Sequence, residues 1–363
     1  MEKIIDPVSK ELLKAELTPD KKLRDTNKGG NEIYVVTWHD SPNVVTEIGR
    51  LREEAFRQAG GSTGLALDLD EYDKMENPYR QIVVWDPDAE AILGGYRYIF
   101  GTDVKFNEAG QPDMTSTHLF HYSDEFIKHY LPHVMELGRS FVAPEYQSSK
   151  AGPKAIFSLD NLWDGITAVI LQHPNIMYFV GKMTMYPSYD ATARNLILHF
   201  LWKHFGDKDE LARPYDLIMP EGDPRLMNLI LKDDDFKQDY RNLKDAVLRL
   251  GTHIPPLVNS YMSLSPTMKM FGTCRNDELA DVYETGIMVC FDEMFEDKKE
   301  RHVRSFIRDN VRAMRERFPE LEEDLEDKLM ERWNTRRQKV HGRWKLRLPK
   351  FRRNTKDDSE KSE

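Results

Sequence analysis

The chain has 363 residues, 40% of them hydrophobic, and a formal net charge of −10 at pH 7. This length and composition predict one large or two smaller domains with a sizeable core, and the acidic balance argues against a nucleic-acid-binding protein. Two cysteines are too few for a disulfide framework and predict a reducing compartment. Because the N-terminus is charged and the longest clean apolar run, 166–171, is far shorter than a membrane span, we expect a cytoplasmic protein.

Residues 1–30 are polar and are predicted to form an N-terminal arm with a short helix near 9–14. A folded domain is expected over 31–295, with a helical insertion at 206–250. Its predicted elements are, in order, a strand at 31–39, a helix opening at 41–43, an acidic loop at 67–73, a hairpin of strands at 81–85 and 91–100, a strand at 136–142, a helix from about Ser158, a strand at 176–181, a helix at 192–205 and a strand at 285–292. This order predicts an α/β (α+β) fold with a mixed sheet.

The predicted strand from Glu136 to Val142 carries charge on both faces. With a period of two, Glu136 shares one face with Gly138, Ser140 and Val142, whereas Arg139 lies on the other. A carboxylate and a guanidinium in an apolar strand are costly to bury unless they are paired or used. This strand is therefore the candidate functional site.

The four histidines that precede this strand do not predict a metal site. His129 and His133 are four residues apart, but Pro132 argues against a continuous helix that would align them. The loop at 147–153 leads into a helix and can therefore cradle a phosphate, although a plain strand–helix connection is equally consistent with it.

From Glu296 the composition becomes highly charged, and apolar residues at helical spacing predict a charged helical and basic tail over 296–353. The run from Arg332 to Arg353 contains no acidic residue and includes Trp333 and Trp344. Basic residues mixed with tryptophan favour a membrane surface or an acidic partner over a solvated tail, so the protein is expected to reside at the inner face of the membrane as a peripheral protein. Residues 354–363 are expected to be disordered.

The segment from Glu136 to Tyr146 resembles the strand signature of the GNAT-like N-acyltransferases that make acyl-ornithine and acyl-glycine lipids. This group includes acyl-homoserine-lactone synthases and proteins described as hemolysin-like. Other family positions follow in the right order over roughly 33–292, namely Arg52-Glu-Glu-Ala-Phe56, Asp70 with Asp73, Arg97, the segment 254–261 and Asp281. The resemblance implies a GNAT-like, mostly antiparallel sheet flanked by helices.

The resemblance also implies a site in which an amine attacks an acyl thioester. This site would contain a charge-balanced network that shapes the acceptor pocket, and Phe56 and Ser140 would lie beside the network. The network would consist of Arg52, Asp70, Asp73, Arg97, Glu136 and Arg139. Glu136 is the candidate general base, because the amine must be neutral to attack. The alternative is that Glu136 is only a structural partner of Arg139 or Arg97.

The same resemblance implies that four residues bind the acyl donor, namely Val142, Gln147, Lys150 and Gly152. Ordinary acetyltransferases of this fold hold a CoA pyrophosphate with Arg/Gln-x-x-Gly-x-Gly/Ala, and here Lys150 replaces the first glycine. The expected donor is therefore acyl carrier protein, with acyl-CoA as the alternative and no bound cofactor. An acidic carrier protein would dock on basic residues such as Lys150 and Lys154 or on the basic tail.

The expected activity is transfer of a (3-hydroxy) fatty acyl group to the amine of glycine or ornithine, which gives an acyl-amino-acid lipid or its lyso precursor. Two alternatives stay open. One is a synthase of a diffusible acylated or lactone-type signal, and the other is a non-catalytic protein that binds membrane or nucleic acid.

Overall fold

The computed structural model describes residues 1–147, 153–232 and 235–345, and its centre is an eight-stranded sheet. In spatial order the strands are β1 (Lys22–Asp25), β2 (Glu32–Val36), β3 (Arg80–Asp86), β4 (Ala91–Phe100), β6 (Val134–Val142), β7 (Tyr178–Met185), β10 (Val282–Cys290) and β9 (Lys269–Asn276). Neighbouring strands are antiparallel except β6 and β7, which are parallel. The predicted mixed, mostly antiparallel sheet flanked by helices is confirmed.

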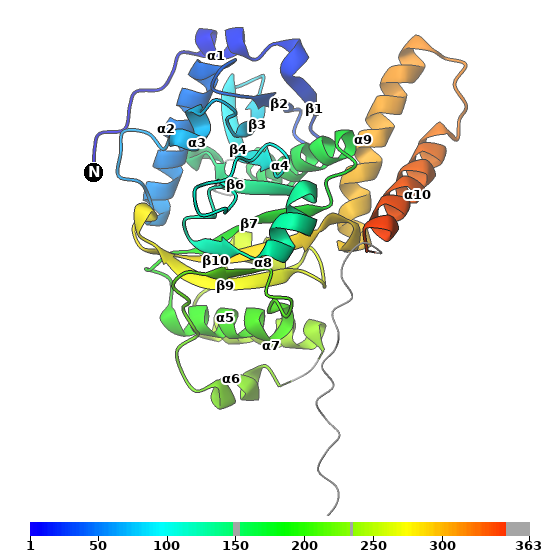
Figure 1. Cartoon of the computed structure of the whole chain (residues 1–363). Helices are drawn as coiled ribbons and strands as arrows, with labels where there is room; N and C mark the ends of the chain where they lie inside the picture. The colour runs from blue at the N-terminus through cyan, green and yellow to red at the C-terminus, as the bar shows by residue number, and fades with distance from the viewer. Residues whose placement is uncertain (148–152, 233–234, 346–363) are drawn as a thin grey trace, which may run out of the picture.

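Helices cover both faces of the first half of the sheet (Figure 1). α1 (Lys10–Glu16) and α2 (Pro42–Ala59) pack on one face, and α4 (Pro153–Gln172) packs on the other. Side chains of a strand alternate between faces, so Val83 and Trp85 join the cluster of α2 while Ile82 and Val84 join that of α4. The start of α4 at Pro153 corrects the expected start near Ser158.

The N-terminal arm and the insertion contain strands that the sequence did not suggest. β1 adds an edge strand to the central sheet, and β5 (Phe120–Tyr122) pairs with β8 (Ala212–Pro214) in a separate two-stranded sheet. β9 was not predicted either. The other α-helices of the folded domain are α3 (Glu71–Lys74), α5 (Ala191–Phe205), α6 (Pro224–Ile230), α7 (Phe236–Arg249) and α8 (Pro256–Met262).

Two C-terminal helices, α9 (Glu296–Arg317) and α10 (Leu325–Lys345), form a hairpin beside the sheet (Figure 1). Val303 and Ile307 of α9 belong to the main core, so this charged segment is packed onto the domain. Within the described ranges, no helix has both the length and the apolarity needed to cross a bilayer.

Arg337 of α10 is 3% exposed and lies inside the protein. Its guanidinium donates to Asp292 at 2.9 Å and to the carbonyls of Pro174 and Ile176 at 2.9 and 2.6 Å. The prediction that the basic run faces a membrane or partner is therefore wrong at Arg337, because its guanidinium is buried and bonded to Asp292 and to two backbone carbonyls. The part of that run beyond residue 345, and the predicted disordered end, lie outside the described residues.

Candidate active site

β6 is distorted where the sequence placed its second charge. Arg139 has a φ of 49°, and Arg139 and Ser140 together lie opposite Tyr96 of β4. Two residues opposite one define a β-bulge, which changes the direction of the following side chains. The prediction of strict alternation from Glu136 to Val142 is therefore wrong beyond the bulge, and Arg139 and Ser140 both line the same cavity.

This cavity opens where β6 and β7 part. Their ladder ends at the pair Glu136 and Val180, and a Cβ on the next residue, Gly181, would lie 2.9 Å from the carbonyl oxygen of Leu137. Beyond this point the two strands border a cavity of about 410 Å³. α2, α8 and β10 line it as well. Its lining residues include Phe56, Tyr96, Val142, Gln147, Lys182, Thr184, Leu257, Tyr261, Val282 and Glu284.

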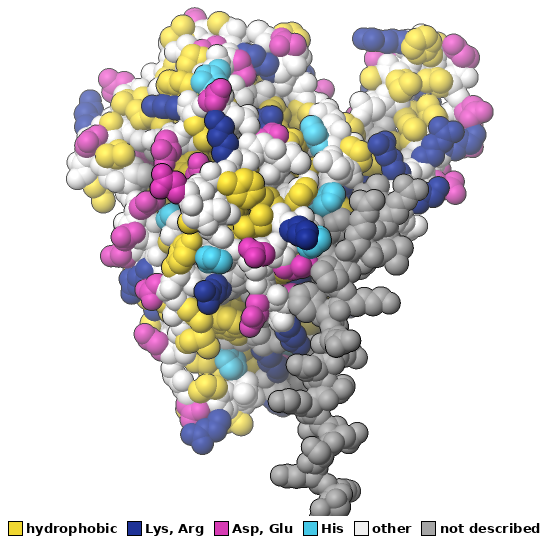
Figure 2. Space-filling view, in the orientation of Figure 1, with side chains coloured by type: hydrophobic (Ala, Val, Ile, Leu, Met, Phe, Trp, Pro, Cys, Tyr) yellow, Lys and Arg dark blue, Asp and Glu magenta, His cyan; other side chains and the backbone are white. Residues whose placement is uncertain are grey.

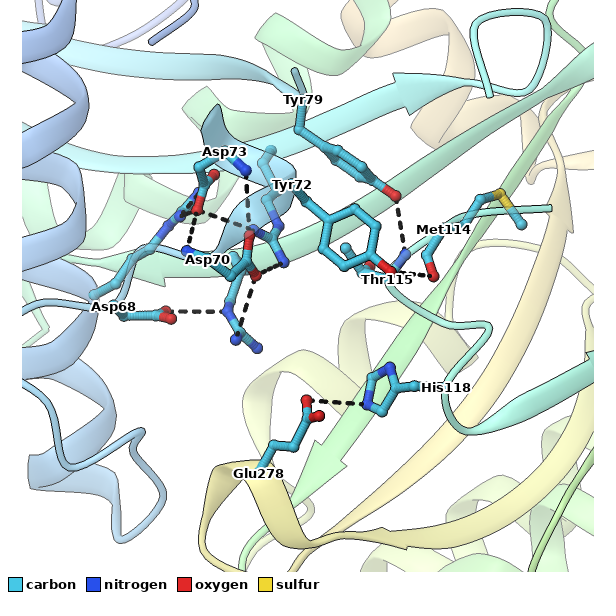
Figure 3. Close-up of polar contacts among 12 residues, drawn as sticks. Asp68, Asp70, Tyr72, Asp73, Tyr79, Met114, Thr115, His118 and Glu278 are labelled. Carbon is cyan, nitrogen blue, oxygen red and sulfur yellow. Dashed lines mark hydrogen bonds and ion pairs between the residues drawn. The ribbon is translucent and has the colours of Figure 1, made fainter. Parts of the chain in front are cut away.

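An ion-pair network lies next to the cavity (Figure 3). Asp70 and Asp73 form a capping box at the start of α3, which fixes both carboxylates. Arg97 donates to both oxygens of Asp70 at 2.7 Å and to Asp73 at 3.0 Å, and Arg52 donates to Asp73 at 3.2 Å. Burial opposes ionisation of Asp73, but the charges of Arg97 and Arg52 outweigh it and hold the pKa of Asp73 well below its usual range.

Arg139 completes this network with a carboxylate that the sequence analysis did not select. Its Nε lies 3.0 Å from Asp68, and its Nη2 lies 3.9 Å from Asp70. Three guanidinium groups and three carboxylates are thus gathered, as expected, but Asp68 takes the place expected for Glu136. Asp68 belongs to the acidic loop at 67–73, whose sequence does not indicate which carboxylates turn inward.

Glu136 is 1% exposed, and both of its carboxylate oxygens accept hydrogen bonds from residues outside the ion-pair network. One oxygen accepts from the Tyr79 hydroxyl and from the amide of Thr115, and the other accepts from the amide and hydroxyl of Ser116. Figure 3 shows the Tyr79 hydroxyl pointing toward Thr115. The expected pairing of Glu136 with Arg97 or Arg139 is wrong, and its role as general base stays a prediction.

The remaining predicted residues divide into two groups. Phe56, Ser140, Val142 and Gln147 line the cavity, and the Gln147 side chain donates to the carbonyl of Val142 at 2.8 Å. Lys150 and Gly152, the core of the predicted phosphate loop, lie outside the described residues.

The floor of the cavity carries charged residues that the sequence did not single out. Lys182 of β7 donates to the carbonyl of Thr115 at 3.1 Å, and burial lowers the pKa of Lys182 although the charge of Glu284 opposes the shift. Glu284 of β10 is 2% exposed and accepts from the Thr184 hydroxyl at 3.2 Å. No local pattern marks these residues, because strand pairing alone brings them together.

His118 lies near this floor, and its Nε2 is 3.6 Å from a carboxylate oxygen of Glu278 (Figure 3). Burial lowers the pKa of His118, and the charge of Lys182 adds to that effect. The cavity therefore combines an apolar wall from α2 and β6 with a charged floor from β7 and β10.

Comparison with known proteins agrees with this architecture. Residues 51–154 match the family model of the acetyltransferase (GNAT) domain. The chain is 58% identical over 316 residues to a glycine N(alpha)-acyltransferase of Bacteroides thetaiotaomicron, covering 87% of this chain and 94% of that protein. A protein of the same name from Phocaeicola vulgatus is 58% identical over 315 residues, covering 87% of this chain and 97% of that protein.

A solved CoA-dependent acyl-homoserine lactone synthase, in complex with SAM and isopentyl-CoA, is also similar. It has a TM-score of 0.34 and 10% identity, covering 75% of this chain and 88% of that one. The fold and the matched domain define an enzyme of the GNAT class, an acyltransferase. The chain belongs to the N-acyltransferase family represented by the two relatives from Bacteroides and Phocaeicola, which confirms the predicted resemblance.

Proposed function

We propose that this enzyme transfers a fatty acyl group from a thioester donor to the amine of glycine. The observation that carries the proposal is the 58% identity to a relative named for this acceptor, over 94% of that relative's length. The cavity supports it, because its apolar wall suits an acyl chain and its charged floor suits a small zwitterion.

The reaction needs no group beyond the two substrates. The nitrogen of glycine attacks the thioester carbonyl, so a C–N bond forms and the C–S bond breaks. Of the three protons on the glycine ammonium, the amide keeps one, the departing thiolate takes one and one is released. The enzyme contributes by holding the two reactants together and by accepting a proton from the amine before attack.

For the donor, we propose acyl carrier protein. Lys150 stands where a CoA-binding loop of this class would have glycine, and an acyl carrier protein presents a single phosphate instead of a pyrophosphate. The edge of β6 beyond Glu136 is not paired with β7 and borders the cavity, so an extended pantetheine chain can lie along it. Acyl-CoA is the alternative donor.

The test is a product assay with purified enzyme. We would supply a 3-hydroxyacyl carrier protein or the matching CoA thioester, with glycine, ornithine or serine as acceptor, and identify the products by mass spectrometry while measuring the released thiol. We expect N-acylglycine and one thiol per product, formed faster from the carrier protein. Absence of acylglycine with both donors would refute the proposal, and ornithine used as well as glycine would refute the choice of acceptor.

A further inference from the structure

The floor of the cavity places a cation and a carboxylate side by side on one face of the sheet. In the antiparallel pair of β7 and β10, Lys182 lies opposite Gly286 and Glu284 lies opposite Thr184. Residues directly opposite share a face, so Lys182 and Glu284 are diagonal neighbours on it. Both side chains line the cavity.

Each of these two groups has unused bonding capacity. Oε2 of Glu284 is buried and, among the residues that the structure describes, has no hydrogen-bond donor. An ammonium has three donors, and Lys182 uses one on the carbonyl of Thr115. Among the described residues, no carboxylate forms an ion pair with Lys182. A buried carboxylate oxygen without a donor is unfavourable unless a ligand satisfies it.

We propose that Lys182 and Glu284 bind the two charged ends of the acceptor amino acid. Lys182 binds the carboxylate, while Oε2 of Glu284 accepts a hydrogen bond from the ammonium and takes the proton that it releases before attack. This inference rests on the proposed function and deepens it, because it assigns the acceptor to the β7–β10 floor.

The charges of the pair suit a small zwitterion. Lys182 and Glu284 occupy diagonal positions that are roughly 7–8 Å apart at the backbone, and the charge of Glu284 acts on Lys182. A cation and a carboxylate held this way on one face can each meet the opposite charge of an amino acid.

Glu284 is also better placed than Glu136 to accept a proton. Both oxygens of Glu136 already accept hydrogen bonds from Tyr79, Thr115 and Ser116, and Glu136 is not among the residues that line the cavity. Glu284 lines the cavity and, within the described part of the chain, keeps one oxygen without a donor.

The experiment compares two acceptors, glycine and glycinamide, which lacks the carboxylate. Steady-state kinetics at saturating donor would be measured for wild type, Lys182→Met, Lys182→Arg and Glu284→Gln. Lys105→Met and Glu76→Gln are the matched controls, because this pair is 71% and 86% exposed. Direct binding of glycine by titration calorimetry gives a readout that does not depend on turnover.

We expect Lys182→Met to raise KM for glycine about 10- to 100-fold, because a hydrogen-bonded charge is lost, while KM for glycinamide changes little. Lys182→Arg should restore part of the preference for glycine. Glu284→Gln should lower kcat at least about 100-fold with both acceptors, since the base is gone. Both control variants should behave as wild type.

Unchanged preference for glycine over glycinamide in Lys182→Met would overturn the proposal for Lys182, and unchanged kcat in Glu284→Gln would overturn that for Glu284. If the wild-type enzyme acylates a different amino acid, the proposed function fails. The kinetics of the Lys182 and Glu284 variants with that amino acid and its amide then show whether the two residues bind the acceptor. If no acceptor reacts, calorimetry decides it: equal binding of glycine to wild type and Lys182→Met, or no binding to wild type, overturns it.

Folding of the variants is checked by thermal unfolding. Lys182→Met removes a cation whose ionisation burial already disfavours, so we expect it to fold. If Glu284→Gln does not fold, the Lys182 variants alone decide whether the floor binds the acceptor.

Discussion

Two fully buried charged groups of this enzyme, Arg52 and Glu136, are each held by several hydrogen-bond partners. Arg52 is fully buried, yet its guanidinium donates to Asp73 at 3.2 Å and to the side chain of Gln81 at 2.6 Å. Glu136 accepts four hydrogen bonds in the same way. Removing one member of such a set leaves its partners buried and unsatisfied, which costs more than the bond itself contributes.

Glu136→Gln separates the structural role of Glu136 from the catalytic one. The glutamine NH₂ would face donors, so we expect the free energy of unfolding to fall by about 1–3 kcal/mol, with activity persisting in the folded fraction. Urea denaturation and kcat would be measured together. Glu76→Gln is the matched control, because that glutamate is 86% exposed. Unchanged stability with a large fall in kcat would instead support Glu136 as the base.

The aspartates of the network predict an acid-sensitive stability. The pKa values of Asp70 and Asp73 are lowered in the folded state, so their stabilisation is complete above the unfolded value of about 4 and is lost as the pH falls below it. We expect Asp73→Asn to lower the free energy of unfolding at pH 7 by about 3–5 kcal/mol, because Arg52 loses its carboxylate. Urea denaturation from pH 7 to pH 2.5 should then show a shallower acid loss in the variant than in wild type. Parallel curves would contradict this.

At the scale of elements, the site depends on how β6 meets its neighbours. The bulge at Arg139 turns both Arg139 and Ser140 to the cavity, and the end of pairing at Val180 leaves room for it. Gly181, the residue after the last β6–β7 pair, allows β7 to lie close to the carbonyl of Leu137 where the strands part.

Gly181→Ala tests that approach. The new Cβ would lie 2.9 Å from the carbonyl of Leu137, so we expect a loss of about 1–3 kcal/mol in the free energy of unfolding. Gly138→Ala is the matched control on the facing strand, because its nearest contact would be 3.7 Å away. It should be neutral or slightly stabilising, since alanine restricts the unfolded chain. Chemical denaturation would measure both variants. Equal losses of unfolding free energy would show that the close contact between Gly181 and Leu137 does not contribute to stability.

At the scale of the whole molecule, the C-terminal hairpin is part of the core structure. His302 of α9 lies 2.7 Å from Asp164 of α4, and Trp333 of α10 packs edge-on against Phe291. Figure 2 shows positive and negative side chains interspersed over the face in view, including the hairpin. Arg332, Arg336 and Lys339 are exposed on α10, so their predicted contact with a membrane or a carrier protein stays a prediction.

Two adjacent arginines test how α10 is attached. Arg337→Ala removes bonds to Asp292 and to two backbone carbonyls, so we expect the free energy of unfolding to fall by about 2–3 kcal/mol. Arg336→Ala removes an exposed side chain and should change it by no more than about 0.5 kcal/mol. Differential scanning calorimetry of the two variants would measure this, and equal melting temperatures would contradict the buried role of Arg337.

The sequence by itself determined much of the fold and part of the site. Local periodicity identified α2, the β3–β4 hairpin, β6 and α5, because side-chain alternation and helical spacing are properties of short segments. The order of Arg52, Asp70, Asp73, Arg97 and Arg139 likewise indicated the family and most of the ion-pair network.

Only the tertiary structure decided which groups meet. Asp68, not Glu136, completes the network, because the bulge in β6 and the turn of the acidic loop bring Asp68 to Arg139. Glu284 meets Thr184, 100 residues away, and so lies diagonal to Lys182. Strand register and burial are set by contacts between distant segments, which no local pattern encodes. For that reason the sequence could point to the β6 strand, whereas the floor of the cavity emerged only from the pairing of β7 with β10.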